Sequence, residues 1–288
     1  MAVKPPLKWA GSKVRVMAEL LKYLPAGKRL VEPFAGSCAV MMNTDYDSYL
    51  IADANHHLVN AYIMMAHHTD ALLIKLEALF AAGSVGSESR RGEFYYCVRN
   101  RLNHGAASSV EQAASFLYLN RHGYNGICRY NLRGEFNVPY GKYKSPYFPE
   151  AEVRAFAEKG KRSSFICADF TETLELVTPG DVIYCDPPYN PVTGKSSFTK
   201  YHATDFDAAC QLRLAAMLEN LADKGHPVIA SNSDSDMTHS QYGTRRFELH
   251  KISVARSVGA ATGGSSSAPE IIAVCLPHTN HGVNQSEK

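Results

Sequence analysis

The sequence of 288 residues lacks any long uninterrupted apolar run, although 45% of its residues are hydrophobic. A membrane-spanning helix needs about 20 consecutive apolar residues, so no such helix is expected. The residues after Met1 contain no apolar core of a signal peptide. Charged residues make up 20% of the chain, which together with the apolar content excludes bulk disorder. We therefore expect a soluble, cytoplasmic protein with a substantial core.

Cysteine is also scarce and poorly arranged for a structural site. The seven cysteines are an odd number, and none forms a Cys-x-x-Cys pair, which argues against a zinc ribbon and against a disulfide framework. The histidine pairs His56-His57 and His67-His68 have no carboxylate or thiolate nearby in the sequence. We therefore expect no metal site.

The glycine-rich fingerprint of dinucleotide-binding folds is absent as well, because only Gly36 is present where that motif has three glycines. A short strand, Leu30-Val31, leads into Glu32-Pro33-Phe34-Ala35-Gly36-Ser37, and a second strand from Tyr49 is closed by Asp53. A strand, a tight glycine turn and an acid at the end of the next strand describe a nucleoside-binding half-sheet. Asp53 would accept hydrogen bonds from ribose hydroxyls, unless it is only a turn residue. The cofactor would then be a nucleoside without phosphates.

Strand and helix patterns alternate at both ends of the chain. We predict further strands at 164–167, 181–185 and 227–230, a terminal hairpin of 247–254 with 271–276, and helices at 12–23, 58–80, 94–118 and 212–224. Residues 84–91 form a polar loop, and periodicity disappears from 120 to 148 among Gly, Asn, Pro and Tyr. The sequence thus predicts an α/β sheet that carries an inserted domain.

Charge is distributed unevenly along the chain. Residues 90–145 hold nine Lys and Arg against three Glu, a net charge of +6 within a chain whose total is +2. Aromatic and amide side chains are interleaved with these cations, as at Tyr124, Asn125, Tyr130 and Asn131. A basic region of this mixture inside a mildly acidic frame predicts a nucleic-acid-binding insert.

The strand that begins at Val182 ends in Asp186-Pro187-Pro188-Tyr189. A carboxylate in this position lies where open α/β sheets bind ligands. The prolines stiffen the loop and remove backbone donors, so its carbonyls can only accept hydrogen bonds. Two acceptors and a tyrosine ring suit a planar group that bears an exocyclic amine.

The N-terminal block Lys8-Trp9-Ala10-Gly11-Ser12-Lys13 contains the single Trp of the chain beside two lysines. A lysine at the start of a helix opposes the helix dipole. Lys13 would therefore cost local stability unless it meets an anion such as a carboxylate; the alternative is a lysine that lies on the surface by chance.

Taken together, these motifs resemble the Dam family of DNA adenine-N6 methyltransferases, from about Pro6 to about Leu276. The resemblance includes the Lys-Trp-Ala-Gly block, the Glu-Pro-Phe turn, the Asp-Pro-Pro-Tyr motif and, most specifically, the stretch from Tyr118 to Pro139. It implies a Rossmann-like sheet that binds S-adenosylmethionine (SAM), formed by residues 1–56 and 160–277. It also implies a mainly helical target-recognition domain at 57–159. The polar composition of residues 278–288 predicts a disordered tail.

The resemblance also implies residue roles. The catalytic loop would be Asp186, Pro187, Pro188 and Tyr189, and the cofactor would be lined by Trp9, Lys13, Phe34, Asp53, Phe170 and Asp186. Tyr124 would insert into the duplex beside a flipped adenine of GATC. The other DNA-binding positions would be Lys8 at the first guanine, Ile127, Arg129 and Pro139 at the bases, Asn131, Asn137, Lys142 and Tyr143 at the backbone, and Asn125.

The resulting hypothesis is a monomeric, metal-free enzyme that flips adenine out of double-stranded DNA and methylates its N6. The target amine is buried in the base stack, so extrusion is required. An amino-methyltransferase that acts on RNA or on a protein glutamine is the alternative, and a DNA-binding module without catalysis is a third possibility. The biological use of the mark stays open among repair, transcription and protection from restriction.

Overall fold

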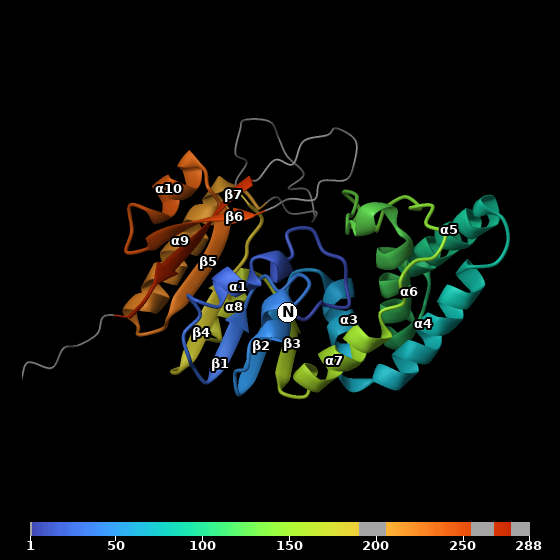
Figure 1. The fold of residues 1–288 in the computed structure, drawn as a ribbon, viewed down its shortest axis with the longest axis horizontal. Helices are drawn as coiled ribbons and strands as arrows, with labels where there is room; N and C mark the ends of the chain where they lie inside the picture. The colour runs from blue at the N-terminus through green and yellow to red at the C-terminus, as the bar shows by residue number, and fades with distance from the viewer. Residues whose placement is uncertain (1, 190–205, 255–267, 278–288) are drawn as a thin grey trace, which may run out of the picture.

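The computed structural model describes residues 2–189, 206–254 and 268–277 (Figure 1). Within these residues the strands form one seven-stranded sheet in the order β3-β2-β1-β4-β5-β7-β6. The strands are β1 (Arg29–Glu32), β2 (Ser48–Asp53), β3 (Ser163–Cys167), β4 (Asp181–Cys185), β5 (Val228–Ser233), β6 (Glu248–Val254) and β7 (Ala268–Cys275).

The sheet has a parallel part and an antiparallel edge. Strands β3, β2, β1, β4 and β5 are parallel, whereas β7 pairs antiparallel with both β5 and β6. Val31 of β1 lies opposite Leu50 of β2 on one side and Ile183 of β4 on the other. The chain order reverses between β1 and β4, and a crevice at the carboxyl ends of two such strands is the usual ligand site of an open α/β sheet.

Apolar residues cover both faces of the central strands, which explains why these short segments are strands buried in a sheet. Leu30, Ile51 and Tyr184 belong to a core cluster on one face, and Val31 and Ile183 belong to a second cluster on the other. The first face is covered by η1 (Lys13–Arg15), α1 (Met17–Leu20), α2 (Ala39–Asn43), α3 (His56–His67) and α7 (Glu150–Gly160). The second face is covered by α8 (Phe170–Glu175), α9 (Ala208–Asp223) and α10 (Asp236–Tyr242).

A helical layer extends from the β3 side of the sheet (Figure 1). It comprises α4 (Thr69–Gly83), α5 (Glu88–His104) and α6 (Ser109–His122), followed by the single turn η2 (Tyr124–Gly126). The last ten residues of α6 are all buried, because the helix packs against α3, α4 and α5. Ser108 and Glu111 form a capping box that fixes the start of α6.

The structure confirms the predicted α/β sheet, its strands and the terminal hairpin. The predicted helix at 12–23 is wrong, because the chain forms a 3-10 turn and a one-turn helix, and Ser12 makes no capping bond. The helical pattern of 58–80 contains a break at His68, and that of 94–118 is interrupted between His104 and Ser109. The predicted loop at 84–91 already ends at Ser87, whose side chain caps α5. The predicted tail, 278–288, lies outside the described residues.

No helix in the described part of the chain is both long enough and apolar enough to cross a membrane.

Candidate active site

The loop after β4 presents a carboxylate held by one buried lysine. The Nζ atom of Lys13 lies 2.6 Å from Oδ2 of Asp186, so Lys13 has the carboxylate partner that its charge required. Lys13 also donates to the carbonyl of Gly11 and is only 4% exposed. A buried ammonium needs such partners. The pairing explains why the N-terminal turn is bent toward the sheet and is not a regular helix.

The second oxygen of Asp186 is shielded from solvent and accepts no hydrogen bond of ordinary geometry within the described residues, because the nearby Tyr189 hydroxyl, which lowers the pKa of Asp186, donates to Glu270. Burial raises the pKa of Asp186 above its ordinary value, while Lys13 opposes that rise. A shielded acceptor without a donor is costly unless a ligand supplies one. The atom is therefore placed to receive an N–H or O–H group from a bound molecule.

Hydrogen bonds from neighbouring elements fix the rest of this loop. The Tyr189 hydroxyl donates to Glu270 of β7 at 3.0 Å, and the ammonium of Lys13 lies 5.0 Å from the centre of the Tyr189 ring. Gln211 of α9 donates to the carbonyl of Pro188 at 2.6 Å. The tyrosine ring and the loop carbonyls are thereby held beside Asp186.

The turn after β1 brings the N-terminal block against the sheet. Gly36 has a φ of +51°, and a Cβ at this position would lie 2.6 Å from Nε1 of Trp9. Only glycine suits both the left-handed backbone and this close approach. The carboxylate of Asp53 accepts from the backbone N–H of Gly36 at 3.1 Å and from that of Asn55 at 3.0 Å, which ties the turn to the end of β2.

These elements enclose a pocket of about 520 Å³ at the carboxyl ends of β1, β2 and β4. All nine residues that the sequence assigned to the cofactor and the catalytic loop line it: Trp9, Lys13, Phe34, Asp53, Phe170, Asp186, Pro187, Pro188 and Tyr189. The rings of Phe34 and Phe170 stack with centroids 5.6 Å apart, and Phe206 meets the Phe34 ring edge-on at 5.5 Å. The pocket thus combines flat apolar faces with carboxylates.

Sequence reasoning missed several residues of this pocket. Glu32 is 2% exposed, and burial raises its pKa to about 8, so it is mostly neutral at pH 7. It stands in the quoted Glu-Pro-Phe motif, which was the available signal. Phe206 and Arg213 also line the pocket, and the guanidinium of Arg213 lies 5.1 Å from the centre of the Phe170 ring. Both belong to the region of α9, where no motif marked them.

The irregular segment from Tyr124 to Tyr143 presents most of the predicted DNA-binding side chains at the surface. Tyr124, Asn125, Arg129, Pro139 and Lys142 are exposed, and Ile127 is partly exposed. Asn125 and Lys142 have φ values of +53° and +58°, so the backbone is sharply bent at both. Lys142 pairs with Glu88 of α5 at 3.2 Å.

Lys8 lies beside this segment although it is far away in the sequence. Its backbone N–H donates to the side chain of Asn120 at 2.9 Å, and its ammonium lies 4.9 Å from the centre of the Tyr143 ring. A Cβ on Gly126 would lie 2.3 Å from the Lys8 side chain, so this glycine leaves room for the lysine. The structure therefore brings Lys8 and Tyr143 together.

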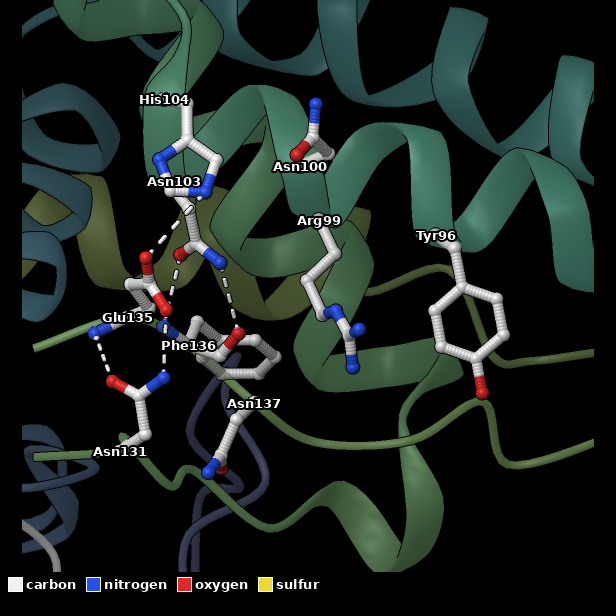
Figure 2. A pocket seen from close by; sticks show the side chains of 9 residues that line it. All are labelled: Tyr96, Arg99, Asn100, Asn103, His104, Asn131, Glu135, Phe136 and Asn137. Carbon is white, nitrogen blue, oxygen red and sulfur yellow. Dashed lines mark hydrogen bonds and ion pairs between the residues drawn. The ribbon is translucent and has the colours of Figure 1, made fainter. Parts of the chain in front are cut away.

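Asn131 and Asn137 help to build the segment. Figure 2 shows them beside a second, smaller pocket of about 190 Å³ between α5 and residues 131–137. The side chain of Asn131 accepts from the backbone of Glu135 at 3.0 Å, and that of Asn137 accepts from Nε of Arg129 at 2.8 Å. Asn103 of α5 forms two hydrogen bonds with the backbone of Phe136, at 2.9 and 3.0 Å.

The comparisons with known proteins agree with this geometry. The model of the D12 class N6 adenine-specific DNA methyltransferase family matches residues 9–258. The Retron Ec67 DNA adenine methylase of Escherichia coli is 51% identical over 269 residues, covering 93% of this chain and 90% of that protein. The DNA adenine methylase of Escherichia coli strain K12 is 40% identical over 94% of this chain and 95% of its own length. The DNA adenine methylase of Vibrio cholerae is 38% identical over 94% of this chain and 96% of its own. The chain therefore belongs to the D12 class of N6 adenine-specific DNA methyltransferases.

Proposed function

We propose that this methyltransferase uses SAM to methylate N6 of adenine in the duplex sequence GATC, and that it flips the adenine out of the helix to do so. The observation that carries the proposal is the partnerless oxygen of Asp186 at the carboxyl end of β4, beside Lys13 and Tyr189. An exocyclic amine is a donor of the right kind for that acceptor. A base paired inside a duplex cannot reach so enclosed a group, which supports base flipping.

Asp186 would act as a hydrogen-bond acceptor for the target amine, together with the carbonyl of Pro187. Accepting both amine hydrogens weakens the conjugation of nitrogen with the base and directs its lone pair toward the methyl group. Tyr189 would stack on the base. The charge that develops on nitrogen is stabilised by the carboxylate, and the fixed loop supplies the positioning.

The pocket fits SAM in its chemistry. The aromatic faces of Phe34 and Phe170 suit a purine ring, and Asp53 suits the ribose hydroxyls. The lining holds both acids, such as Asp53 and Asp169, and cations, Lys13 and Arg213, which suits a molecule that carries charges of both signs. When bound, SAM supplies an activated methyl group. Trp9 and Lys13 would complete the wall of the pocket, and Lys13 would keep Asp186 ionised through their ion pair.

The remaining assignments follow the same division. Residues 57–159 would form the target-recognition domain and residues 1–56 with 160–277 the catalytic domain. Arg129, Ile127 and Pro139 would read bases, Tyr124 would enter the duplex, and Lys8 would contact the first guanine. The exposed Lys142 suits a phosphate, and Asn125, Asn131, Asn137 and Tyr143 would contact the sugar-phosphate backbone of the DNA.

The test is labelled methyl transfer from SAM to a library of duplexes, followed by mapping of the modified bases. We expect N6-methyladenine confined to GATC. Methylation of the adenine of another sequence would overturn the specificity but keep the reaction. Methyl groups found only on cytosine, on RNA or on a protein glutamine would overturn the reaction. No transfer, with duplex binding intact, would indicate a DNA-binding module.

A further inference from the structure

A buried polar network connects the edge of the large pocket with the residues on either side of Arg129. Its centre is Asn55, which is 3% exposed and precedes α3. The side-chain amide of Asn55 donates to Sγ of Cys128 at 3.6 Å, and its carbonyl accepts from the Tyr130 hydroxyl at 3.1 Å. Cys128 and Tyr130 are the sequence neighbours of Arg129. The exposed arginine is thus anchored on both sides.

Tyr130 is held at a defined place on α3. Its hydroxyl oxygen lies 3.1 Å from Nδ1 of His57, and the two rings are stacked with centroids 5.8 Å apart. Burial lowers the pKa of His57 to about 4, so the imidazole is neutral at pH 7; because the Tyr130 hydroxyl donates to Asn55, Nδ1 of His57 is the donor to that hydroxyl. Phe136 meets the tyrosine ring edge-on at 5.7 Å. The side chain therefore has little freedom to move independently of the helix.

The other end of the network reaches the large pocket. The backbone N–H of Asn55 donates to Oδ1 of Asp53 at 3.0 Å, and Asp53 lines the pocket. The side chain of Asn55 also accepts from the backbone of His57 at 3.1 Å, so it caps α3 as well as holding Tyr130. The bonds of Asn55 to Asp53, His57 and Cys128 are buried and its bond to Tyr130 is partly buried. Because breaking one of them costs free energy, these groups are expected to shift together and not independently.

We propose that Asn55 is a positioning residue that couples cofactor binding to base reading. The inference rests on the proposed function, in which Asp53 binds the cofactor and Arg129 reads a base. Both ligands require the same arrangement of residues 53–58 and 128–130, so the ligand that binds first orders that arrangement for the second. The coupling is reciprocal. If the cofactor increases the preference for the recognition sequence over another sequence by a given factor, then the enzyme binds the cofactor more tightly on the recognition sequence than on the other sequence, by that same factor.

Asn103 offers a matched comparison, because it is also an amide that braces the recognition segment. Its two bonds to Phe136 come from α5, and Figure 2 shows it beside the smaller pocket, whose lining does not include Asp53. A change at Asn103 removes support from the backbone of Phe136 but breaks none of the hydrogen bonds that join Asn55 to Asp53, Cys128 and Tyr130. A comparison of variants at the two sites therefore distinguishes a loss of coupling to the cofactor from a loss of local support of the recognition segment.

The experiment uses Tyr130→Phe, which removes the hydroxyl and keeps the ring. Affinities for a GATC duplex and for a duplex altered at one base are measured with and without S-adenosylhomocysteine. S-adenosylhomocysteine, the product that forms from the cofactor, should increase the preference of the wild type for GATC. In Tyr130→Phe this increase should be about fivefold smaller, the effect of roughly one hydrogen bond. Cys128→Ala, on the other side of Arg129, should lose part of the rise too. It provides a second test if one variant folds poorly.

Two controls define the outcome. Tyr118→Phe removes a buried hydroxyl that has no partner within the described residues, and it should behave as wild type. Asn103→Ala should lower the preference equally with and without the product. The proposal is wrong if the wild type shows no product-dependent rise, or if Tyr130→Phe keeps that rise or behaves like Asn103→Ala. Methyl transfer by the wild type is assayed in parallel, and its absence would instead count against the proposed function.

Discussion

The loop after β4 and the segment from Tyr124 to Tyr143 are held in place in different ways. The loop follows a fully buried strand, and its carboxylate is fixed by Lys13, which is itself only 4% exposed. The segment forms isolated β-bridges in place of strands and is held by several backbone hydrogen bonds and by side chains from other elements, among them Asn55 and Asn103. In the proposed function, chemistry is thus attached to the buried sheet, whereas base reading is placed on an exposed, irregular surface that scattered contacts hold in shape.

This difference predicts that damage to the loop stops the reaction and damage to the segment changes its selectivity. In the loop, the proposed function gives the contact with the target amine to one charged group, Asp186. In the segment, many polar groups share the binding of a long, uniformly charged partner, so each contributes a part. The predictions below test this contrast, beginning with the largest effect.

Replacing Asp186 should cause the largest loss. Asp186→Ala removes the proposed acceptor for the amine, and we expect methyl transfer to fall by at least about 100-fold, near 2.7 kcal/mol in barrier. Duplex binding should remain, because the exposed cations of the segment lie elsewhere. Single-turnover transfer and a binding titration measure the two quantities. Lys13 also loses its partner in Asp186→Ala, and Asp186→Asn, which keeps an oxygen for Lys13, controls for that loss. Transfer within tenfold of wild type in Asp186→Ala would refute the assigned role.

Replacing Lys13 should shift the pH dependence of the reaction. Burial raises the pKa of Asp186 and Lys13 opposes the rise, so Lys13→Gln should raise that pKa further. The ionised carboxylate is the form that accepts the amine hydrogens. The acid limb of the rate profile should therefore move to higher pH. Below that limb the rate falls about tenfold per pH unit, and it is recovered as pH increases. An equal loss at every pH would show that Lys13 acts only on the shape of the pocket.

Replacing Asp53 should weaken the cofactor more than the DNA. Asp53→Ala removes a charged acceptor, and we expect SAM affinity to fall by about 10- to 150-fold, the equivalent of roughly 1.5–3 kcal/mol. Titration of the cofactor without DNA measures this effect, and a thermal melt checks that the turn around Gly36 is preserved. Unchanged affinity would leave Asp53 as a turn residue that holds the backbone of Gly36 and Asn55.

The two regions were also unequally predictable from the sequence. Asp53 and Asp186 could be placed because each ends a buried apolar strand, and parallel strands bring their carboxyl ends to one edge. The need of Lys13 for an anion followed from the unfavourable charge of a lysine at the expected start of a helix. The helix expected around it does not form, because its bonds to Asp186 and Gly11 favour a tighter turn.

The supports of the segment could not be predicted in the same way. Asn55 and Tyr130 lie 75 residues apart, and their contact depends on how α3 packs against α6. The same holds for Asn103 and Phe136, which are separated by 33 residues. An asparagine has no periodic signal, and in a sequence it is equally consistent with a cap, a turn or a surface position. Their roles emerge only from the tertiary structure.

Within the segment, Arg129 should affect selectivity. Its guanidinium is exposed and is oriented by Asn137, and arginine pairs with O6 and N7 of guanine. Arg129→Ala should reduce the preference for GATC over single-base variants by roughly 1–3 kcal/mol at the base that it reads. Competition between GATC and each variant duplex measures the loss. Equal weakening on every sequence would mean that Arg129 contacts only the backbone.

Lys142 should give the smallest effect and no change in selectivity. Its side chain is 71% exposed, and its partner Glu88 is exposed too, so their ion pair contributes little and the ammonium can turn to a phosphate. Lys142→Ala should weaken all duplexes by a similar factor and lower the slope of log affinity against log salt by about one unit. Glu88→Gln is the complementary variant: it frees Lys142 and should strengthen all duplexes slightly at low salt. Titrations at several salt concentrations measure both slopes. If Lys142→Ala lowers the preference for GATC, this lysine belongs to the base-reading residues and does not only contact a phosphate.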